Sequence, residues 1–224
     1  MAISYIGFDC GNVLVQFDTE RFYSFIRRHR GNSLEPQELF SGSKKQITID
    51  YDLGRLTDEE YFESVKDAFK MDGLKPDLFF YLLGSIIIVD YAMLEIRDNF
   101  RKKGVKTFIV SNMNHFHLNY LRKSHPEVVS GFDFSMISCE EGIDKPNQEA
   151  WLRSFNKYGI KGEDCIFIDD VVKNIEVACS LGIKGWHFNV KDSKFISNGK
   201  LIDERKKLRN FLEFLWREGI LSGT

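Results

Sequence analysis

Three short apolar runs along the chain end in polar residues, and each is followed by a segment of helical character. The runs cover residues 3–8, 105–110 and 165–168, and they lead into Asp9, Ser111 and Asp169. Continuous apolar runs of this length are typical of strands buried on both faces, and their alternation with helices favours right-handed crossovers. The pattern therefore predicts an α/β fold with a doubly wound parallel sheet. A last helix over residues 203–218 is expected to pack on this core.

The first two predicted strands are separated by about a hundred residues, far more than a crossover needs. This stretch reads as helical throughout. One helix is expected to begin at Thr19, with Phe22, Phe25 and Ile26 on its buried face. A second helix is expected to follow the capping box at residues 57–60. We interpret the stretch as an inserted helical cap.

Composition removes several classes of protein. A length of 224 residues suits one large core with a smaller insert. The net charge of -2, without a basic stripe, argues against nucleic-acid binding. The most apolar stretch, residues 78–89, is too short to span a membrane. No signal-peptide pattern opens the sequence, and the four cysteines lack metal-site or disulfide spacing, so we expect a cytoplasmic protein with reduced thiols.

Polar side chains at the ends of parallel strands meet at one edge of the sheet, where ligands bind in open α/β folds. An ionised Asp9 at such a place is costly unless a cation or hydrogen-bond donors meet it. Ser111 and Asn112 offer a hydroxyl, an amide and the free N–H groups of a helix start, which suit phosphate oxygens. Taken alone, each of these residues has an ordinary alternative as a turn residue or helix cap.

Two further positions carry charge. Lys145 precedes Pro146, which restricts the lysine to a non-helical loop conformation, although a lone lysine is more often a solvated surface charge. Asp169 and Asp170 close a buried strand, and like charges this close resist joint ionisation without a cation. Magnesium suits them because it prefers carboxylate oxygens. The alternative is a turn and helix cap.

The order of these residues resembles the haloacid dehalogenase superfamily, which has a nucleophilic Asp after the first strand, a Ser or Thr after the second, a Lys, and an acidic pair. The matching residues are Asp9, Ser111, Lys145, Asp169 and Asp170. The segments D-x-G-N-V, S-N-x-N, K-P and D-D-x-x-x-N are similar to those of the subfamily IA branch that includes sugar phosphatases acting on glucose 1-phosphate. The likeness runs from about residue 3 to residue 188.

This resemblance implies a Rossmann-like core, residues 1–15 and 92–224, with an all-helical type 1 cap, residues 16–91. It implies Mg²⁺-dependent hydrolysis of a small phosphorylated metabolite, a sugar phosphate, through an aspartyl-phosphate. The catalytic residues implied are Asp9, Ser111 and Lys145, and the substrate-binding residues are Ser111, Asn112 and Lys145. The metal ligands implied are Asp9, the carbonyl of Gly11 and Asp170, with Asp169 binding directly or through its neighbours.

One position departs from the family pattern. Most phosphatases of this superfamily have a second Asp where this chain has Gly11, and that Asp protonates the leaving oxygen. Loss of a general acid costs about 10²- to 10⁴-fold in rate, so we expect slow turnover or a good leaving group such as an anomeric sugar oxygen. Asp18 is the candidate substitute, although a helix cap is the more ordinary role for it.

Several readings stay open from the sequence. A 2-haloacid dehalogenase needs no acidic pair, and a phosphomutase needs the acid that Gly11 lacks. A catalytically weak or inactive sugar-phosphate-binding protein is the alternative from another class. The residues that select the substrate are left open among Gln16, Asp18, Phe22 and Tyr51. Two histidines, His115 and His117, are interpreted as solvated helix residues. The sequence carries no signal for an oligomeric state.

Overall fold

The computed structural model describes residues 2–31, 33–189 and 200–223. Its core is a parallel sheet with the strand order β5-β4-β1-β6-β7. The strands are β1 (Tyr5–Phe8), β4 (Lys106–Ser111), β5 (Phe134–Ile137), β6 (Cys165–Asp169) and β7 (Lys184–His187). Phe8 pairs with Ile109 on one side and Ile168 on the other. Asp9 therefore leaves the sheet between the ends of β4 and β6. The predicted α/β fold with a parallel sheet is confirmed.

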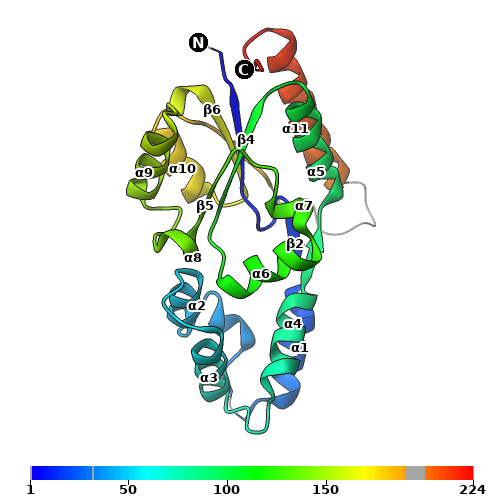
Figure 1. The fold of residues 1–224 in the computed structure, drawn as a ribbon. Coiled ribbons are helices and arrows are strands. Elements are labelled where there is room, and N and C mark those ends of the chain that lie inside the picture. Colours follow the sequence, from blue (N-terminus) through cyan, green and yellow to red (C-terminus); the bar gives the residue numbers. More distant parts are fainter. Residues whose placement is uncertain (1, 32, 190–199, 224) are drawn as a thin grey trace.

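Helices cover both faces of this sheet (Figure 1). One face packs on α5 (Tyr91–Lys102) and α11 (Lys200–Arg217), the other on α9 (Gln148–Tyr158) and α10 (Val172–Ser180). Because strand residues alternate between faces, Phe8 and Ile168 join the first apolar cluster, whereas Phe108 and Phe167 join the second. Shorter helices connect these layers: α6 (His115–Ser124), α7 (Pro126–Val129), α8 (Ser138–Glu141) and the 3-10 turn η2 (Gly162–Asp164).

The insertion between β1 and β4 forms a group of helices beyond the carboxyl ends of the sheet strands (Figure 1). It contains α1 (Thr19–His29), the 3-10 turn η1 (Pro36–Leu39), α2 (Lys45–Asp52), α3 (Asp58–Phe69) and α4 (Pro76–Ser85). The expectation that the stretch is helical throughout is wrong where the insertion joins the core. There β2 (Val15–Phe17) pairs antiparallel with β3 (Ile87–Val89). The hydrogen bonds between β2 and β3 satisfy backbone N–H and C=O groups at the point where the chain leaves the core and returns to it.

Local signals placed the helices well. The capping box of α3 is present, since Thr57 Oγ1 accepts from Glu60 N at 3.2 Å and Thr57 N donates to Glu60 Oε2 at 2.8 Å. Helix α1 begins at Thr19 and buries Phe22 and Ile26. The last helix starts three residues before the predicted boundary. Among the described residues no helix combines the length and apolar character needed to cross a membrane. All four cysteines are free thiols.

Candidate active site

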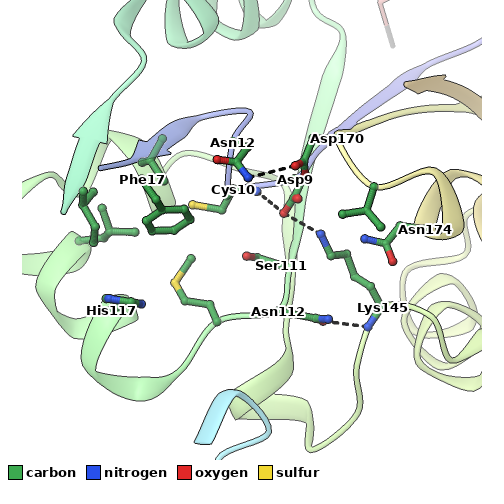
Figure 2. A pocket seen from close by; sticks show the side chains of 16 residues that line it. Asp9, Cys10, Asn12, Phe17, Ser111, Asn112, His117, Lys145, Asp170 and Asn174 are labelled. Carbon is green, nitrogen blue, oxygen red and sulfur yellow. Dashed lines mark hydrogen bonds and ion pairs between the residues drawn. The ribbon is translucent and has the colours of Figure 1, made fainter. Parts of the chain in front are cut away.

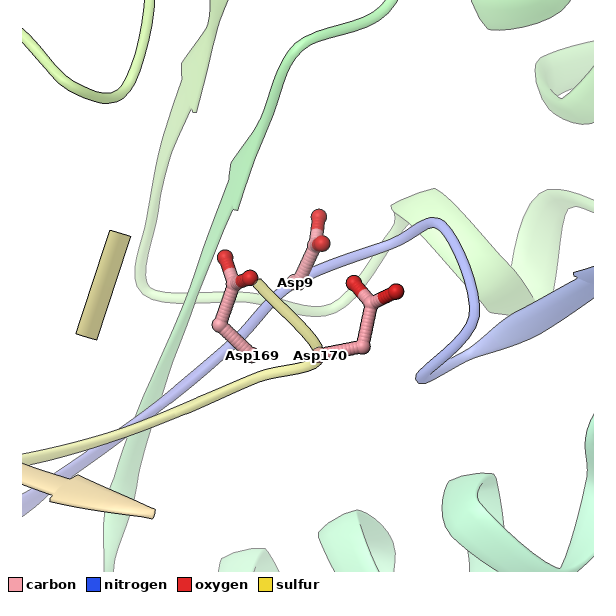
Figure 3. A group of neighbouring side chains, drawn as sticks. All are labelled: Asp9, Asp169 and Asp170. Carbon is pink, nitrogen blue, oxygen red and sulfur yellow. The ribbon is translucent and has the colours of Figure 1, made fainter. Parts of the chain in front are cut away.

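The polar residues predicted at the strand ends meet at one edge of the sheet (Figure 2; Asp169 is drawn in Figure 3). Asp9 follows β1, Ser111 ends β4, Asp169 ends β6, and Lys145 lies on the loop after α8. A cavity of about 200 Å³ opens here, and its walls include Asp9, Gly11, Ser111, Asn112, Lys145 and Asp170. Asp169 lies buried beside it. The sequence-predicted residues are therefore brought together around one cavity.

Three carboxylates converge beside this cavity (Figure 3). One oxygen from each of Asp9, Asp169 and Asp170 lies within 4.8 Å of the others. Asp9 and Asp169 are almost completely buried. Such a group is unfavourable without positive charge nearby, because burial removes the water that would otherwise stabilise each ion.

Lys145 supplies part of that charge. Its Nζ lies 2.7 Å from Asp9 Oδ1 and 2.8 Å from Asp169 Oδ2, and its side chain is only 5% exposed. The backbone N of Lys145 donates to Asn112 Oδ1 at 2.8 Å, and its carbonyl accepts from Trp151 Nε1 at 2.9 Å. These bonds fix the loop from both sides. Lys145 is thus a buried cation and not a solvated surface charge.

Asp169 has little capacity left for a metal ion. Its Oδ1 accepts from Val171 N at 2.7 Å, and Asn174 Nδ2 lies 3.1 Å from both of its oxygens. Its Oδ2 also accepts from Lys145. By contrast, Asp9 Oδ1 accepts from Cys10 N at 2.6 Å and from Lys145, while Oδ2 accepts no hydrogen bond from the described residues. The geometry leaves Asp9 better placed than Asp169 to react or to bind an ion.

The charge balance of the site favours a cation. Burial raises the pKa of Asp9 to about 8, with further contributions from Asp169 and Asp170, while Lys145 opposes the rise. Burial also raises the pKa of Asp170. Burial alone would lower the pKa of Lys145, but the charges of Asp9 and Asp169 raise it above its ordinary value. One protonated lysine among three carboxylates leaves negative charge uncompensated, and their oxygens are the ligands that Mg²⁺ prefers.

Two amides at the site carry roles that the sequence did not assign. Asn12 Nδ2 donates to Asp170 Oδ2 at 3.0 Å, and Asn12 has a left-handed backbone with φ of 56°. Asparagine tolerates that conformation better than most residues. Asn174, on α10, holds both oxygens of Asp169. The D-D-x-x-x-N spacing was the available signal for Asn174, since it carries the amide from the strand end into the following helix.

The interpretation of His117 as a solvated residue is wrong, whereas His115 is exposed as expected. His117 is half-buried and lines the cavity. Its Nε2 lies 3.3 Å from Leu83 O, and its Nδ1 lies 3.2 Å from Asn114 Nδ2. Burial lowers the pKa of His117 to about 4, so the imidazole is neutral at ordinary pH.

The substitute acid considered for Gly11 is not at the site. Asp18 is exposed at the N-cap of α1, makes no capping hydrogen bond with its side chain, and does not line the cavity. A Cβ at position 11 would lie 3.0 Å from Phe17 Cε2, so the Phe17 ring occupies the space that a larger residue would need.

Comparison with curated proteins finds distant relatives. The chain is 26% identical over 182 residues to acyl-CoA dehydrogenase family member 10 from Mus musculus, covering 79% of this chain but only 17% of the mouse protein. It is 25% identical over 154 residues to a sesquiterpene phosphatase from Aspergillus oryzae, covering 61% of this chain and 76% of that protein. The chain thus spans a small part of the first relative and about three quarters of the second.

Solved structures share the fold. A haloacid dehalogenase family enzyme from Bacteroides thetaiotaomicron superposes with a TM-score of 0.75 at 20% identity, over 90% of this chain and 99% of that one. The same wild-type enzyme in complex with magnesium and inorganic phosphate gives a TM-score of 0.71 at 22% identity, over 83% and 94%. The family model for haloacid dehalogenase-like hydrolases matches residues 3–182. The chain therefore belongs to the haloacid dehalogenase-like hydrolase family.

Proposed function

We propose that this hydrolase is a Mg²⁺-dependent phosphatase of the subfamily IA sugar-phosphatase branch, which cleaves a small sugar phosphate through an aspartyl-phosphate. The observation that carries the proposal is the group of three carboxylates and one buried lysine around a cavity at the sheet edge. The relatives agree with it, since one is described as a phosphatase and a structural neighbour was solved with magnesium and phosphate.

The residues present fit a magnesium ion. Asp9, Asp170 and the carbonyl of Gly11 would hold it. Asp169 would contribute indirectly, by fixing the side chains of Lys145 and Asn174, because its oxygens already accept hydrogen bonds from them. When bound, the ion neutralises phosphate charge and orients the phosphoryl group toward Asp9. The uncompensated negative charge among the carboxylates is the reason for expecting it.

The chain's own groups divide the work of the reaction. Lys145 and the Cys10 N–H hold Oδ1 of Asp9, which leaves Oδ2 free to attack phosphorus. Ser111 presents its hydroxyl to the phosphoryl oxygens. Because Asn112 Oδ1 is engaged by the Lys145 N–H, the Asn112 amide N–H₂ is the group available to donate to them. Lys145 neutralises charge on both the carboxylate and the phosphoryl group.

The covalent steps balance as two displacements at phosphorus. In the first, the Asp9 oxygen–phosphorus bond forms as the bond to the leaving oxygen breaks, and that oxygen takes a proton from water because Gly11 offers none. In the second, an oxygen–phosphorus bond forms from water as the bond between Asp9 and phosphorus breaks, a proton of that water passes to the solvent, and inorganic phosphate and the Asp9 carboxylate are released. A leaving group of low pKa, such as an anomeric oxygen, needs the missing acid least.

We also propose the division of the chain into a core, residues 1–15 and 92–224, and a cap, residues 16–91. The β2–β3 ribbon supports it, since the chain leaves and re-enters the core side by side there. A cytoplasmic location belongs to the same proposal, and the four free thiols agree with it.

A phosphate-release screen over sugar phosphates tests the function. We expect release with Mg²⁺, none with EDTA, and none from Asp9→Asn, while Asp67→Asn on the exposed face of α3 keeps full activity. Release that persists in Asp9→Asn assigns the wrong nucleophile. Halide release from a 2-haloacid in the presence of EDTA would instead make the chain a dehalogenase.

A further inference from the structure

A second cavity of about 170 Å³ adjoins the active-site cavity and shares Phe17, Asn112 and His117 with it. Its other walls come mainly from the cap helices, with apolar faces from residues such as Phe40 and Leu83. The space is therefore placed to receive the part of a substrate that lies beyond the phosphoryl group. The polar and charged residues of this cavity therefore restrict which leaving groups the enzyme can accept.

Asp52, the last residue of α2, is the charged residue of this second cavity. Its Oδ1 accepts from Asn114 Nδ2 at 3.0 Å, and this is the one side-chain hydrogen bond that Asp52 makes with the described residues. Asn114 has no second N–H to donate to Asp52, because its Nδ2 also bonds His117 Nδ1 at 3.2 Å. Its Oδ1 accepts from His117 N at 2.8 Å. The second oxygen of Asp52 accepts no hydrogen bond from the described residues, and Asp52 lines the cavity.

Within the described part of the chain, the cavity lining around Asp52 offers no compensating positive charge. None of the described residues that line this cavity is Lys or Arg. His117 donates its Nε2–H toward Leu83 O and is neutral, because burial lowers its pKa to about 4. Burial raises the pKa of Asp52 to about 7, which reflects the same lack of a cation. An oxygen in this position gains most from a hydrogen-bond donor on a bound ligand.

We propose that Asp52 is a specificity-determining residue that binds a hydroxyl group of the substrate's leaving group and repels a second anionic group. The inference rests on the proposed phosphatase function and narrows its substrate class to monophosphates of hydroxylated alcohols that carry no second anionic group. Above about pH 8, where Asp52 is ionised, a second phosphate or a carboxylate in this cavity would face a carboxylate that no Lys or Arg of the described lining compensates, and the two charges would repel each other.

Wild type itself gives a first test. At about pH 9, where Asp52 is ionised, we expect higher kcat/KM for glucose 1-phosphate than for glucose 1,6-bisphosphate. Equal or faster turnover of the bisphosphate would overturn the inference. If wild type hydrolyses no phosphate ester at all, the proposed function fails, which is a separate result.

Variants of Asp52 give the second test. Asp52→Ala should lower kcat/KM for glucose 1-phosphate by about 10- to 100-fold, which is the effect of losing a charged hydrogen bond. The kcat/KM for p-nitrophenyl phosphate, whose leaving group has no additional hydroxyl, should change by less than about threefold. At about pH 9, where Asp52 is ionised, Asp52→Asn should lower the ratio of kcat/KM for glucose 1-phosphate to kcat/KM for glucose 1,6-bisphosphate by about tenfold or more. Equal losses on both monophosphates would show a purely structural role and overturn the inference.

A matched control lies on the same helix. Asp50 pairs with Arg55 at 2.9 Å on the surface and does not line the cavity. Asp50→Asn should therefore leave kcat/KM unchanged for all three substrates. Activity on p-nitrophenyl phosphate reports whether each variant folds. Should Asp52→Ala fail there, the change in substrate ratio in Asp52→Asn decides the question.

Discussion

Removing the buried cation at position 145 is a demanding test of the electrostatics. In Lys145→Met the chain keeps a side chain of similar length, but Asp9 and Asp169 lose contacts of 2.7 and 2.8 Å. Deleting one partner of a buried ion pair typically costs about 3–5 kcal/mol of folding free energy, since the other charge is left uncompensated. Lys161→Met is the control, because Lys161 is 75% exposed and its pair with Glu163 at 3.9 Å should contribute at most about 1 kcal/mol.

The loss should depend on pH in a defined direction. The pKa of Asp9 in the folded protein is raised to about 8, above its unfolded value, so this group weakens folding as pH rises from about 4 toward 8. Without Lys145 the folded pKa of Asp9 rises further. Above about pH 8 wild-type Asp9 ionises against Lys145, whereas the variant must keep its proton or accept an unpaired charge. The destabilisation should therefore be larger at about pH 9 than at about pH 6.

Urea unfolding with EDTA present measures both quantities, the free energy of unfolding at each pH and its difference between variant and wild type. A Lys145→Met variant that matches the Lys161→Met control, or whose loss is greater at the lower pH, would refute the reasoning. Activity of Lys145→Met should fall by at least about 10²-fold, since the cation touches the reacting carboxylate.

Three further predictions follow from the same geometry. Asn174→Ala removes the amide that lies 3.1 Å from both Asp169 oxygens, so kcat should fall by about tenfold or more, while Asn156→Ala on α9 should have no effect in the same assay. Excess MgCl₂ should raise Tm more at about pH 9 than at about pH 6, because the buried carboxylates must lose protons to bind it; equal shifts in thermal melts would argue against a carboxylate site. Gly11→Asp should speed hydrolysis of esters with poor leaving groups only when Phe17→Ala removes the ring that lies 3.0 Å from the new Cβ, and a gain in the single variant would show that the ring moves aside.

Much of the core could be predicted because its signals are local. A buried parallel strand is a continuous apolar run, and the residue that ends it lies at the sheet edge whatever the rest of the chain does. Asp9, Ser111 and Asp169 were located on that basis. The capping box at Thr57 is likewise a short-range pattern, set by hydrogen bonds within one helical turn.

The misses depend on contacts between distant segments. The sequence around His117 is that of a polar helix, and the residue is half-buried because of α4, whose Leu83 O lies 3.3 Å from its Nε2. Asp52 lies in one cavity wall with Asn114, its hydrogen-bond partner 62 positions along the chain, and no local pattern predicts that contact. The β2–β3 ribbon joins segments of three residues each, too short for a periodic pattern to distinguish from helix or loop.

Covalent capture of the phosphoryl group tests the central claim most directly. Wild type quenched with acid during turnover of a phosphate ester, and then digested and analysed by mass spectrometry, should carry a hydroxylamine-sensitive phosphoryl group on the peptide that contains Asp9. The group should be absent from Asp9→Asn treated in the same way. A phosphorylated peptide elsewhere in the chain, or turnover in Asp9→Asn at the wild-type rate, would contradict the account.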